Sequence, residues 1–378
     1  MKASNGPRVC SVKHVDINLF ARMFAERFDF PRSSDYARCL VHAAVRRKSL
    51  ESIYNNHNGL PPDSFFNFFK YSMSTVVDAM DGFFHRQAGI LGEQGCVVAV
   101  DTNDVEYWGD TDDEYVHCKK GISKNAYVLR YASVSVVDEK HKLTLACLPV
   151  SKNDDLADIV KLLLEKARTL VKIDTVLLDR GFYSTRILKI IREMGMDYVI
   201  PLKKQKWSDL VWEESKATGV FKHRYILNKP VDPLQTWVYL SKKKEKKNEK
   251  KKQVEAGTKR KTRKVKKRKE REYVGVISSK NVHPEAVPDF MDWYFVRNNV
   301  EISYKEKNCY KILTCSTDKA FRLLIYCICH YLMNLSQVVR TVNRTFFRND
   351  ELKKLVKLLL EKPFTGEHRL SRTLVVIA

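Results

Sequence analysis

The segment from residue 96 to residue 201 constrains the fold most, because short apolar runs and amphipathic runs follow one another there in a recognisable order. In chain order we expect strands at 96–100, 126–137 and 142–150, a helix from 154 to about 171, a strand at 175–178, a helix from about 184 to 194, and a strand at 198–201. The first three strands form an antiparallel meander, whereas the later strands are joined through helices and pair in parallel. This order predicts an α/β fold with a mixed sheet flanked by helices.

Helical patterns precede and follow this segment. Apolar positions recur at helical spacing in residues 40–53 and 65–84, and the two runs are separated by the breaker Gly59-Leu60-Pro61-Pro62. Residues 1–94 are therefore expected to form a helical N-terminal domain. Further helices are expected at 289–307, 319–347 and 351–361.

Residues 203–288 have a different pattern, with tryptophan-containing strand fragments at 220–227, 236–241 and 272–277. We interpret this part as an all-β insertion subdomain that interrupts a core made of residues 95–202 and 289–348. Residues 349–378 then form a C-terminal helix and tail.

Positive charge is concentrated in one tract of this insertion. The chain has 68 Lys and Arg against 45 Asp and Glu, a net charge of +23. Residues 242–271 hold 18 Lys or Arg and 4 Glu, which leaves +9 for the rest of the chain. The tract has almost no apolar residues and is expected to be a solvated loop, either a localisation-like patch or a contact to a phosphate backbone. Since the remainder is also basic, a polyanion is the expected partner.

Two carboxylates follow buried strands: Asp101 after Cys-Val-Val-Ala-Val, and Asp179 after Asp-Thr-Val-Leu-Leu. A carboxylate at such a position is costly unless it is hydrated, paired or bound to a metal. The alternative for each is an ordinary cap or turn residue. A third carboxylate, Glu301, lies on the helix expected at 289–307. At 100° per residue, one stripe of that helix carries Tyr294, Arg297, Glu301, Lys305 and Asn308. The alternative for Glu301 is a simple ion pair with Arg297 one turn away.

Three convergent carboxylates suit a pair of Mg²⁺ ions, which take hard oxygen ligands. Two such ions activate an attacking oxygen and stabilise the leaving oxygen of a phosphoryl displacement. In a strongly basic chain, this arrangement indicates cleavage of nucleic acid.

The motifs resemble those of insertion-sequence DDE transposases. Asp179-Arg180-Gly181-Phe182-Tyr183-Ser184 looks like the second-aspartate motif of that family, Tyr294-x2-Arg297-x3-Glu301 resembles its Y-R-E signature, and Asp101-Thr102 matches the first-aspartate position. The resemblance covers about residues 95–345 and is to the branch with a β insertion before the glutamate. It implies a ribonuclease H-like core that binds two Mg²⁺ ions, with Mn²⁺ as a substitute, through Asp101, Asp179 and Glu301.

The resemblance also implies how DNA is handled. Tyr294 and Arg297 would bind DNA phosphates, a role that suits the guanidinium fork. The substrates would be double-stranded DNA, both the terminal repeats of the element and the target, held by a homodimer on paired ends. Residues 1–94 would bind the ends. The family has a lysine seven residues after the glutamate, where this chain has Asn308, and Lys305 stands in for it because it shares the helix face. Trp207, Trp212 and Trp237 are expected to pack within the insertion, with stacking on an extruded base as the alternative.

Other classes are disfavoured. The eleven-residue apolar run at 323–333 is too short to span a bilayer, no P-loop predicts a nucleotide cofactor, and no export signal occurs in the first 20 residues. We therefore expect a cytoplasmic, nucleoid-associated transposase that catalyses metal-dependent DNA cleavage and strand transfer. The alternatives are a nuclease of the same fold without strand transfer, and a transposase-derived DNA-binding protein without catalysis.

Overall fold

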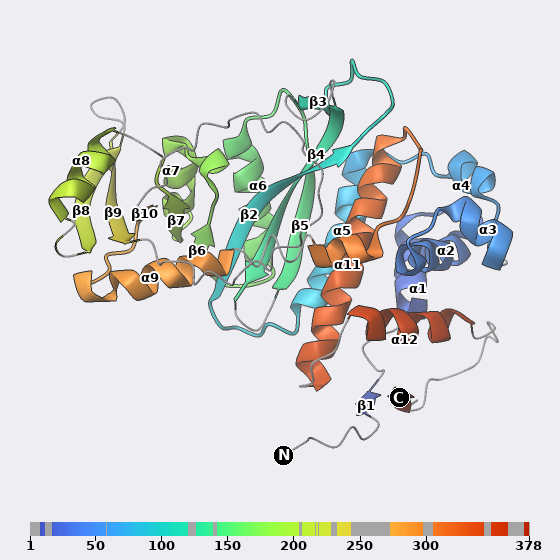
Figure 1. Ribbon diagram of the computed structural model, residues 1–378. Coiled ribbons are helices and arrows are strands. Elements are labelled where there is room, and N and C mark those ends of the chain that lie inside the picture. The colour runs from blue at the N-terminus through green and yellow to red at the C-terminus, as the bar shows by residue number, and fades with distance from the viewer. Residues whose placement is uncertain are drawn as a thin grey trace, which may run out of the picture.

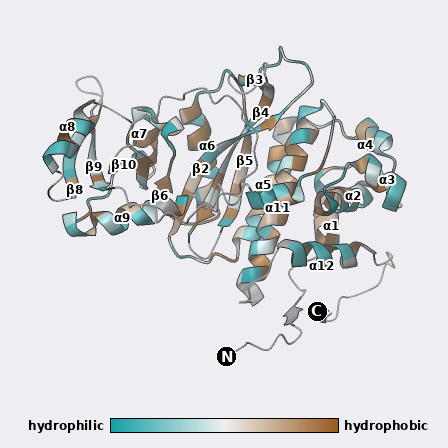
Figure 2. Ribbon diagram, in the orientation of Figure 1, coloured by the Kyte–Doolittle hydropathy of each residue, from teal (hydrophilic) through white to brown (hydrophobic). Residues whose placement is uncertain are grey.

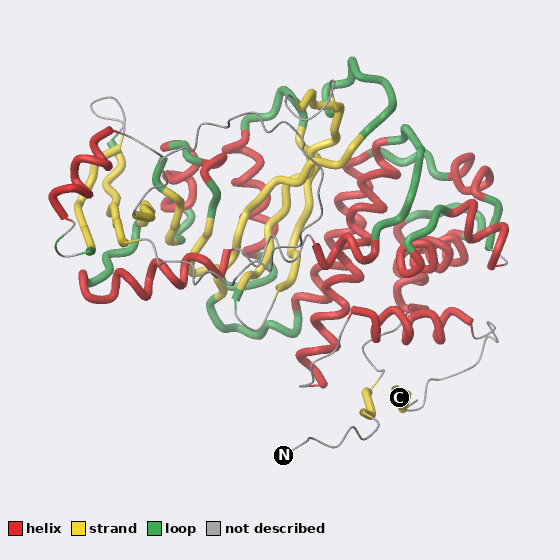
Figure 3. Tube along the Cα trace, viewed as in Figure 1, coloured by secondary structure: helices red, strands yellow, loops and turns green. Residues whose placement is uncertain are grey.

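The computed structural model describes residues 8–11, 17–57, 59–119, 126–138, 142–203, 206–215, 217, 219–227, 233–242, 273–297, 305–343, 349–361 and 374–377. At its centre is a nine-stranded mixed sheet, with helices on both faces and a helical domain beside its β5 edge (Figures 1 and 3). The strands are β2 (Cys96–Glu106), β3 (Val116–Lys119), β4 (Ala126–Val137), β5 (Lys142–Val150), β6 (Ile173–Leu177), β7 (Asp197–Pro201), β8 (Val220–Leu227), β9 (Leu234–Lys242) and β10 (Tyr273–Ser278).

The first five core strands have the order β5–β4–β2–β6–β7. β5, β4 and β2 pair antiparallel, and β2, β6 and β7 pair parallel. The short strand β3 pairs with the beginning of β4, next to the part of β4 that pairs with β5. This is the meander followed by βαβ crossovers that the sequence predicted, and it is the arrangement of a ribonuclease H-like fold. β4 and β5 have the predicted bounds, whereas β3 was not predicted.

The strands of the insertion continue this same sheet. β10 pairs antiparallel with β7, and β9 and β8 follow outward from it. The insertion also contains a helix, α8 (Lys206–Ser215), which covers β8 by stacking Trp207 on Tyr225 with ring centroids 5.0 Å apart. The sequence predicted the strands but not α8 or the strands' pairing with the core.

The two faces of the sheet are covered by different helices. α6 (Leu156–Arg168) and α7 (Thr185–Glu193) share the main core with Val98, Val176 and Tyr198. The residues at the alternate positions of these strands face the other side of the sheet. Ala99, Leu177 and Val199 pack there with α9 (Val287–Tyr294). Peripheral helices such as α8 and α9 alternate hydrophilic and hydrophobic residues (Figure 2), as expected for elements with one buried face. α6 is capped by Asp155, which accepts the Ala157 N–H, so the helix begins at Leu156 rather than at the expected residue 154.

The helices that precede the sheet in sequence are α1 (Ile17–Arg27), α2 (Ser33–Arg46), α3 (Leu50–His57), α4 (Pro62–Phe68) and α5 (Met73–Ala88), and their buried residues join the main core. The run at 40–53 is split because Arg47 takes a left-handed conformation and the Ser49 hydroxyl caps the next helix by accepting the Ser52 N–H. The run at 65–84 is split likewise, since Ser72 caps α5. α5 and α11 (Lys319–Asn343) lie side by side against β5 (Figure 1).

The C-terminal part also differs from the prediction in its details. The helix expected at 289–307 begins earlier, as α9, and changes to a 3₁₀ turn at Phe295–Arg297. α12 (Asn349–Glu361) lies on α2, and β1 (Arg8–Ser11) pairs antiparallel with β11 (Leu374–Ile377), a pairing that was not predicted. Within the described residues, no helix is both long enough and apolar enough to cross a membrane.

Candidate active site

Asp101 and Asp179 lie side by side at one edge of the parallel part of the sheet. β2 and β6 pair Ala99 with Leu177, so each aspartate lies two residues beyond the same matched pair. The Asp101 Oδ1 accepts the Thr102 N–H at 2.9 Å, and the Asp179 Oδ1 accepts the Gly181 N–H at 2.6 Å. Each carboxylate therefore has one oxygen fixed by the backbone and a second oxygen, Oδ2, facing the site.

The sequence suggested that the strand β2 ends at Asp101, but in the structure it does not end there. It continues to Glu106 because β4 is long enough to pair with it along this whole stretch. β6 ends at Leu177, however, so only β4 flanks β2 beyond that point. Asp101 is thus held inside an antiparallel ladder with β4, and it lies just beyond the end of the β2–β6 pairing, where Arg297 approaches it.

Tyr294 anchors α9 to this edge. Its hydroxyl donates to the carbonyl oxygen of Leu178 at 3.1 Å, and its side chain is buried. Burial, opposed by the nearby Arg297, raises the pKa of the Tyr294 phenol above its usual value, so the group stays neutral. We expected Tyr294 to contact a DNA phosphate; in this structure its hydroxyl is hydrogen-bonded to the protein, just before the turn Phe295–Arg297.

Arg297 lies between the two aspartates. Its Nη2 is 3.6 Å from the Asp101 Oδ2 and 3.7 Å from the Asp179 Oδ2. The guanidinium is only 12% exposed, and its Nε has no hydrogen-bond partner among the described residues. Adjacent carboxylates repel each other, so the positive charge of Arg297 compensates for both.

The remaining predicted residues are distributed differently. Glu301 lies outside the described residues, as does the rest of 298–304. Lys305 is exposed, as expected for a phosphate contact, and Asn308 begins a 3₁₀ turn. Lys307, which the sequence did not single out, is buried with its Nζ 4.1 Å from the centre of the Tyr326 ring, and burial lowers its pKa to about 8.

The chemistry of the pair fits a divalent cation. Both Oδ2 atoms converge on one cationic group, and carboxylate oxygens are the ligands that Mg²⁺ prefers. The described residues alone contain no cluster of three metal-binding side chains, and the third ligand is assigned by sequence to Glu301. Asp104, three residues beyond Asp101, pairs with Arg130 at 2.8 Å, which outweighs the effect of burial and holds the pKa of that carboxyl below its usual range.

A basic and aromatic pair, Lys203 and Tyr183, lies on the same edge. β6 and β7 run parallel and pair Leu177 with Val199, so Lys203 follows β7 much as Asp179 follows β6. The Lys203 Nζ donates to the Tyr183 carbonyl oxygen at 3.3 Å and lies 5.0 Å from the centre of its ring. Sequence reasoning missed this lysine, although its position after a parallel strand was the available signal.

The fold and these residues define a class of proteins that hold carboxylates at the strand ends of a ribonuclease H-like sheet. Comparison with protein families makes the assignment specific. The transposase DDE domain family matches residues 92–333, which include Asp101, Asp179, Tyr294, Arg297 and Glu301. The chain therefore belongs to this transposase family. No curated protein matches the chain significantly.

Proposed function

We propose that this transposase cuts DNA at the ends of its element and joins the freed ends to a target by two-metal phosphoryl transfer. The observation that supports this most directly is the in-register placement of Asp101 and Asp179 with Arg297 between them. Two neighbouring carboxylates at the strand ends raise the free energy of the folded protein unless a cation compensates their charge. A site that binds metal and DNA phosphate would explain why both are present at this place.

Asp101, Asp179 and Glu301 would hold the metal, with Mg²⁺ as the expected ion and Mn²⁺ as its substitute. When bound, two such ions activate the attacking oxygen and stabilise the leaving oxygen. Arg297 would bind the phosphate next to the scissile bond, and Tyr294 keeps Arg297 in place through its hydrogen bond to Leu178. Lys305 and Lys203 would contact neighbouring phosphates.

The reaction has two steps at one site. In the first, a water oxygen bonds to phosphorus and the P–O3′ bond breaks, which leaves a 3′-hydroxyl on the element and a 5′-phosphate on the flanking DNA. In the second, that 3′-oxygen bonds to a target phosphorus while a P–O3′ bond of the target breaks. One phosphodiester bond forms as another is lost, so the second step needs no nucleotide cofactor.

The assembly that we propose is a homodimer on two paired ends, because both ends must be cut and joined together. The N-terminal domain would bind the terminal repeats. Residues 242–271 and the exposed lysines would supply contacts to the phosphate backbone, the salt-dependent part of DNA affinity. The protein would act in the cytoplasm on nucleoid DNA.

The test uses the DNA that flanks the gene. Wild-type protein and the Asp179→Asn variant are incubated with these ends and Mg²⁺ or Mn²⁺, and the new 3′-ends are mapped by sequencing gel. We expect metal-dependent cuts at matching inverted ends, no cuts with the variant, and nearly equal DNA binding by both. Asp158→Asn is the matched control because Asp158 is exposed and pairs only with Arg186 among the described residues.

A second duplex added to the reaction separates the alternatives. Joining of the cut ends to this duplex supports strand transfer, whereas cuts without joining identify a nuclease of the same fold. Binding without any cut by the wild type identifies a DNA-binding derivative. Cleavage by Asp179→Asn at the wild-type rate would contradict the assignment of the metal site.

A further inference from the structure

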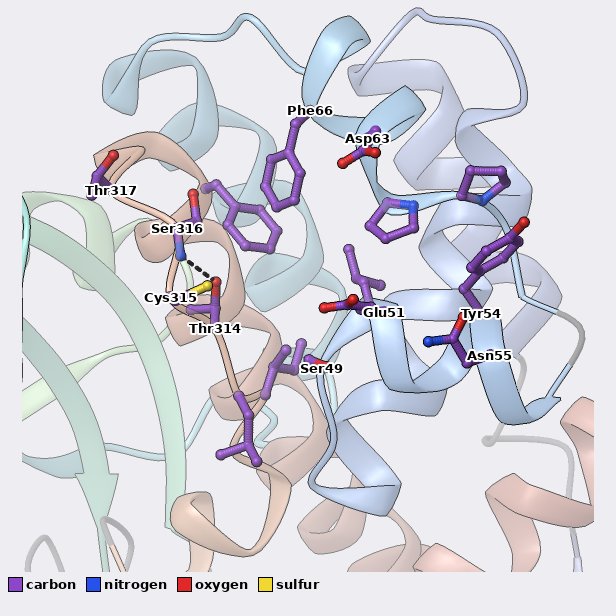
Figure 4. A pocket seen from close by; sticks show the side chains of 16 residues that line it. Ser49, Glu51, Tyr54, Asn55, Asp63, Phe66, Thr314, Cys315, Ser316 and Thr317 are labelled. Atoms are coloured by element: carbon purple, nitrogen blue, oxygen red, sulfur yellow. Dashed lines mark hydrogen bonds between the residues drawn. The ribbon is translucent and has the colours of Figure 1, made fainter.

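A pocket of about 660 Å³ lies at the end of the molecule that is opposite to the insertion. One wall comes from α3 and α4 of the N-terminal domain, and the other from residues 312–317, which lead into α11 (Figure 4). Phe66 and Phe321 contribute aromatic surface, with ring centroids 5.0 Å apart. The transposition chemistry proposed above makes no use of this pocket.

The pocket carries negative charge from two exposed acidic side chains, Glu51 and Asp63. Glu51 and Asp63 extend from the helical wall toward the opposite segment (Figure 4), and no Lys, Arg or His side chain lines the pocket. Within the described part of the chain, neither carboxylate takes part in an ion pair or a hydrogen bond. Some other acids of this basic protein are paired with a cation, as Asp81 is with Lys166 and Asp113 is with Lys319. The electrostatics therefore favour a cationic ligand.

The pocket also offers apolar surface beside these carboxylates. Tyr54 is 45% exposed and Leu313 is 47% exposed. Pro61 and Pro62 add further apolar area. The long methylene chains of Lys and Arg pack on such surfaces while their charged ends reach a carboxylate. The lining thus suits lysine or arginine side chains more than a compact metal ion.

The backbone of the second wall can pair with an added strand. Residues 312–317 alternate between inward and exposed side chains, as a strand does, but belong to no sheet. The Leu313 N–H donates to the Lys48 carbonyl on one side at 3.2 Å. Among the described residues, the N–H and C=O groups of Thr314 have no hydrogen-bond partner. An extended peptide can bind such a segment through its main chain.

We propose that this pocket binds the basic tract, residues 242–271, of a second copy of the chain. The tract carries 18 Lys or Arg among its residues and is the strongest concentration of positive charge in the sequence. It is attached at Lys242 and near Tyr273, which pair with each other in β9 and β10. These strands and the pocket are at opposite ends of the molecule (Figure 1), an arrangement that favours a contact between two copies over one within a single copy.

In a pair with twofold symmetry, each copy would give its tract and receive the other's, so that the contact occurs twice. This inference goes beyond the proposed function, since it concerns how two copies associate and needs neither metal nor cleavage. Its test is done without DNA and without metal, so failure of the catalytic proposal does not affect the result.

The first measurement is the binding of a fluorescent synthetic peptide of residues 242–271, followed by anisotropy. We expect the double variant Glu51→Gln/Asp63→Asn to bind it about tenfold more weakly than the wild type, because two opposing charges are lost. The control Glu165→Gln/Glu285→Gln removes the same charge from exposed positions elsewhere and should stay within about twofold. Thermal melting of each variant checks that it is folded. Equal binding by the wild type and the pocket variant would overturn the proposal.

The second measurement is self-association by sedimentation velocity. One full-length chain has residues 243–271 replaced by a Gly/Ser segment of equal length, and the other carries Glu51→Gln/Asp63→Asn. We expect each to associate less than the wild type when alone, because one half of the contact is missing. A mixture should form heterodimers, since the tract of the second chain meets the intact pocket of the first. If the chain without the tract associates as the wild type does, the tract serves DNA alone and the proposal is wrong.

Discussion

The Nη2 of Arg297 lies 3.6 Å from the Oδ2 of Asp101, although the insertion and most of the core separate the two residues in sequence. The same Nη2 lies 3.7 Å from Asp179, so one guanidinium compensates for both carboxylates. A cation bound between the aspartates would take over this role. Under the proposed function, the metal and Arg297 would compete for the same two oxygens, and Arg297 would become available to contact a phosphate.

Replacing Arg297 by Gln should therefore destabilise the metal-free protein and make it more responsive to metal. Loss of the charge leaves two neighbouring carboxylates uncompensated, which we expect to cost about 1–3 kcal/mol, between the values for exposed and buried ion pairs. Added Mg²⁺ or Mn²⁺ should raise the melting temperature of Arg297→Gln more than that of the wild type. Differential scanning fluorimetry with a metal titration measures both effects.

The chain provides a matched control for this experiment. Arg186 also pairs with two aspartates, Asp155 and Asp158, but all three side chains are about half exposed. Arg186→Gln should change stability by no more than about 1 kcal/mol and leave the metal response as in the wild type. If Arg297→Gln behaves like Arg186→Gln, the guanidinium does not compensate the two carboxylates.

The tryptophans of the insertion should separate into a structural and a surface type. Trp212 is 3% exposed and packs on Tyr273 with ring centroids 5.2 Å apart. Trp212→Ala should cost about 3–5 kcal/mol, as for other buried aromatic truncations, and should be visible in urea unfolding.

Trp237 provides the contrast to Trp212. It is only partly buried, and the Lys222 Nζ lies 4.7 Å from the centre of its ring. Trp237→Ala should cost clearly less stability and should weaken DNA binding, measured by anisotropy with a short duplex. Equal losses of stability for both variants would show that Trp237 is a packing residue too.

The convergence of Asp101 and Asp179 was predictable because each follows an apolar run, and parallel strands joined by a helix bring such positions to one edge. The bounds of β4 and β5 were predictable too, since both are long, mostly apolar runs rich in β-branched and aromatic residues, separated by the polar stretch 138–141. These features could be predicted because they depend on the local order of apolar and polar residues along each strand.

Other features depend on partners that the sequence pattern does not specify. The insertion strands were predicted, but nothing local indicates that β10 pairs with β7. β3 is short and polar, so its pairing depends on the beginning of β4. The hydrogen bond from the Tyr294 hydroxyl to Leu178 forms where α9 ends and the 3₁₀ turn begins. The sequence predicted one continuous helix at 289–307, so it did not predict this change in the backbone.

Lys307 predicts a pH dependence of stability. Burial lowers its pKa to about 8 in the folded protein, whereas an exposed lysine has a value near 10.5. Between these pH values the unfolded chain binds more protons, so this residue makes stability rise with pH from about 8 to 10.5. Lys307→Met should therefore be more stable than the wild type at pH 7, and its advantage should shrink toward pH 10.5. Melting curves across this range measure the difference, and an advantage independent of pH would show that Lys307 is not buried as a cation.

Residues 242–271 should dominate the salt dependence of DNA binding. Each phosphate contact that releases counterions contributes about 0.9 to the slope of log K against log salt concentration. Replacing 243–271 by a Gly/Ser segment of equal length should make this slope less steep, by the amount that several phosphate contacts contribute. It should also weaken binding to all duplexes alike. Selectivity for the element's ends should remain, because lysine side chains contact the phosphate backbone, which carries no sequence information, rather than base edges. Titrations of an end duplex and a scrambled duplex at several salt concentrations test both parts. An unchanged slope would show that the tract does not bind DNA, and a loss of selectivity would show that it contributes to reading the sequence.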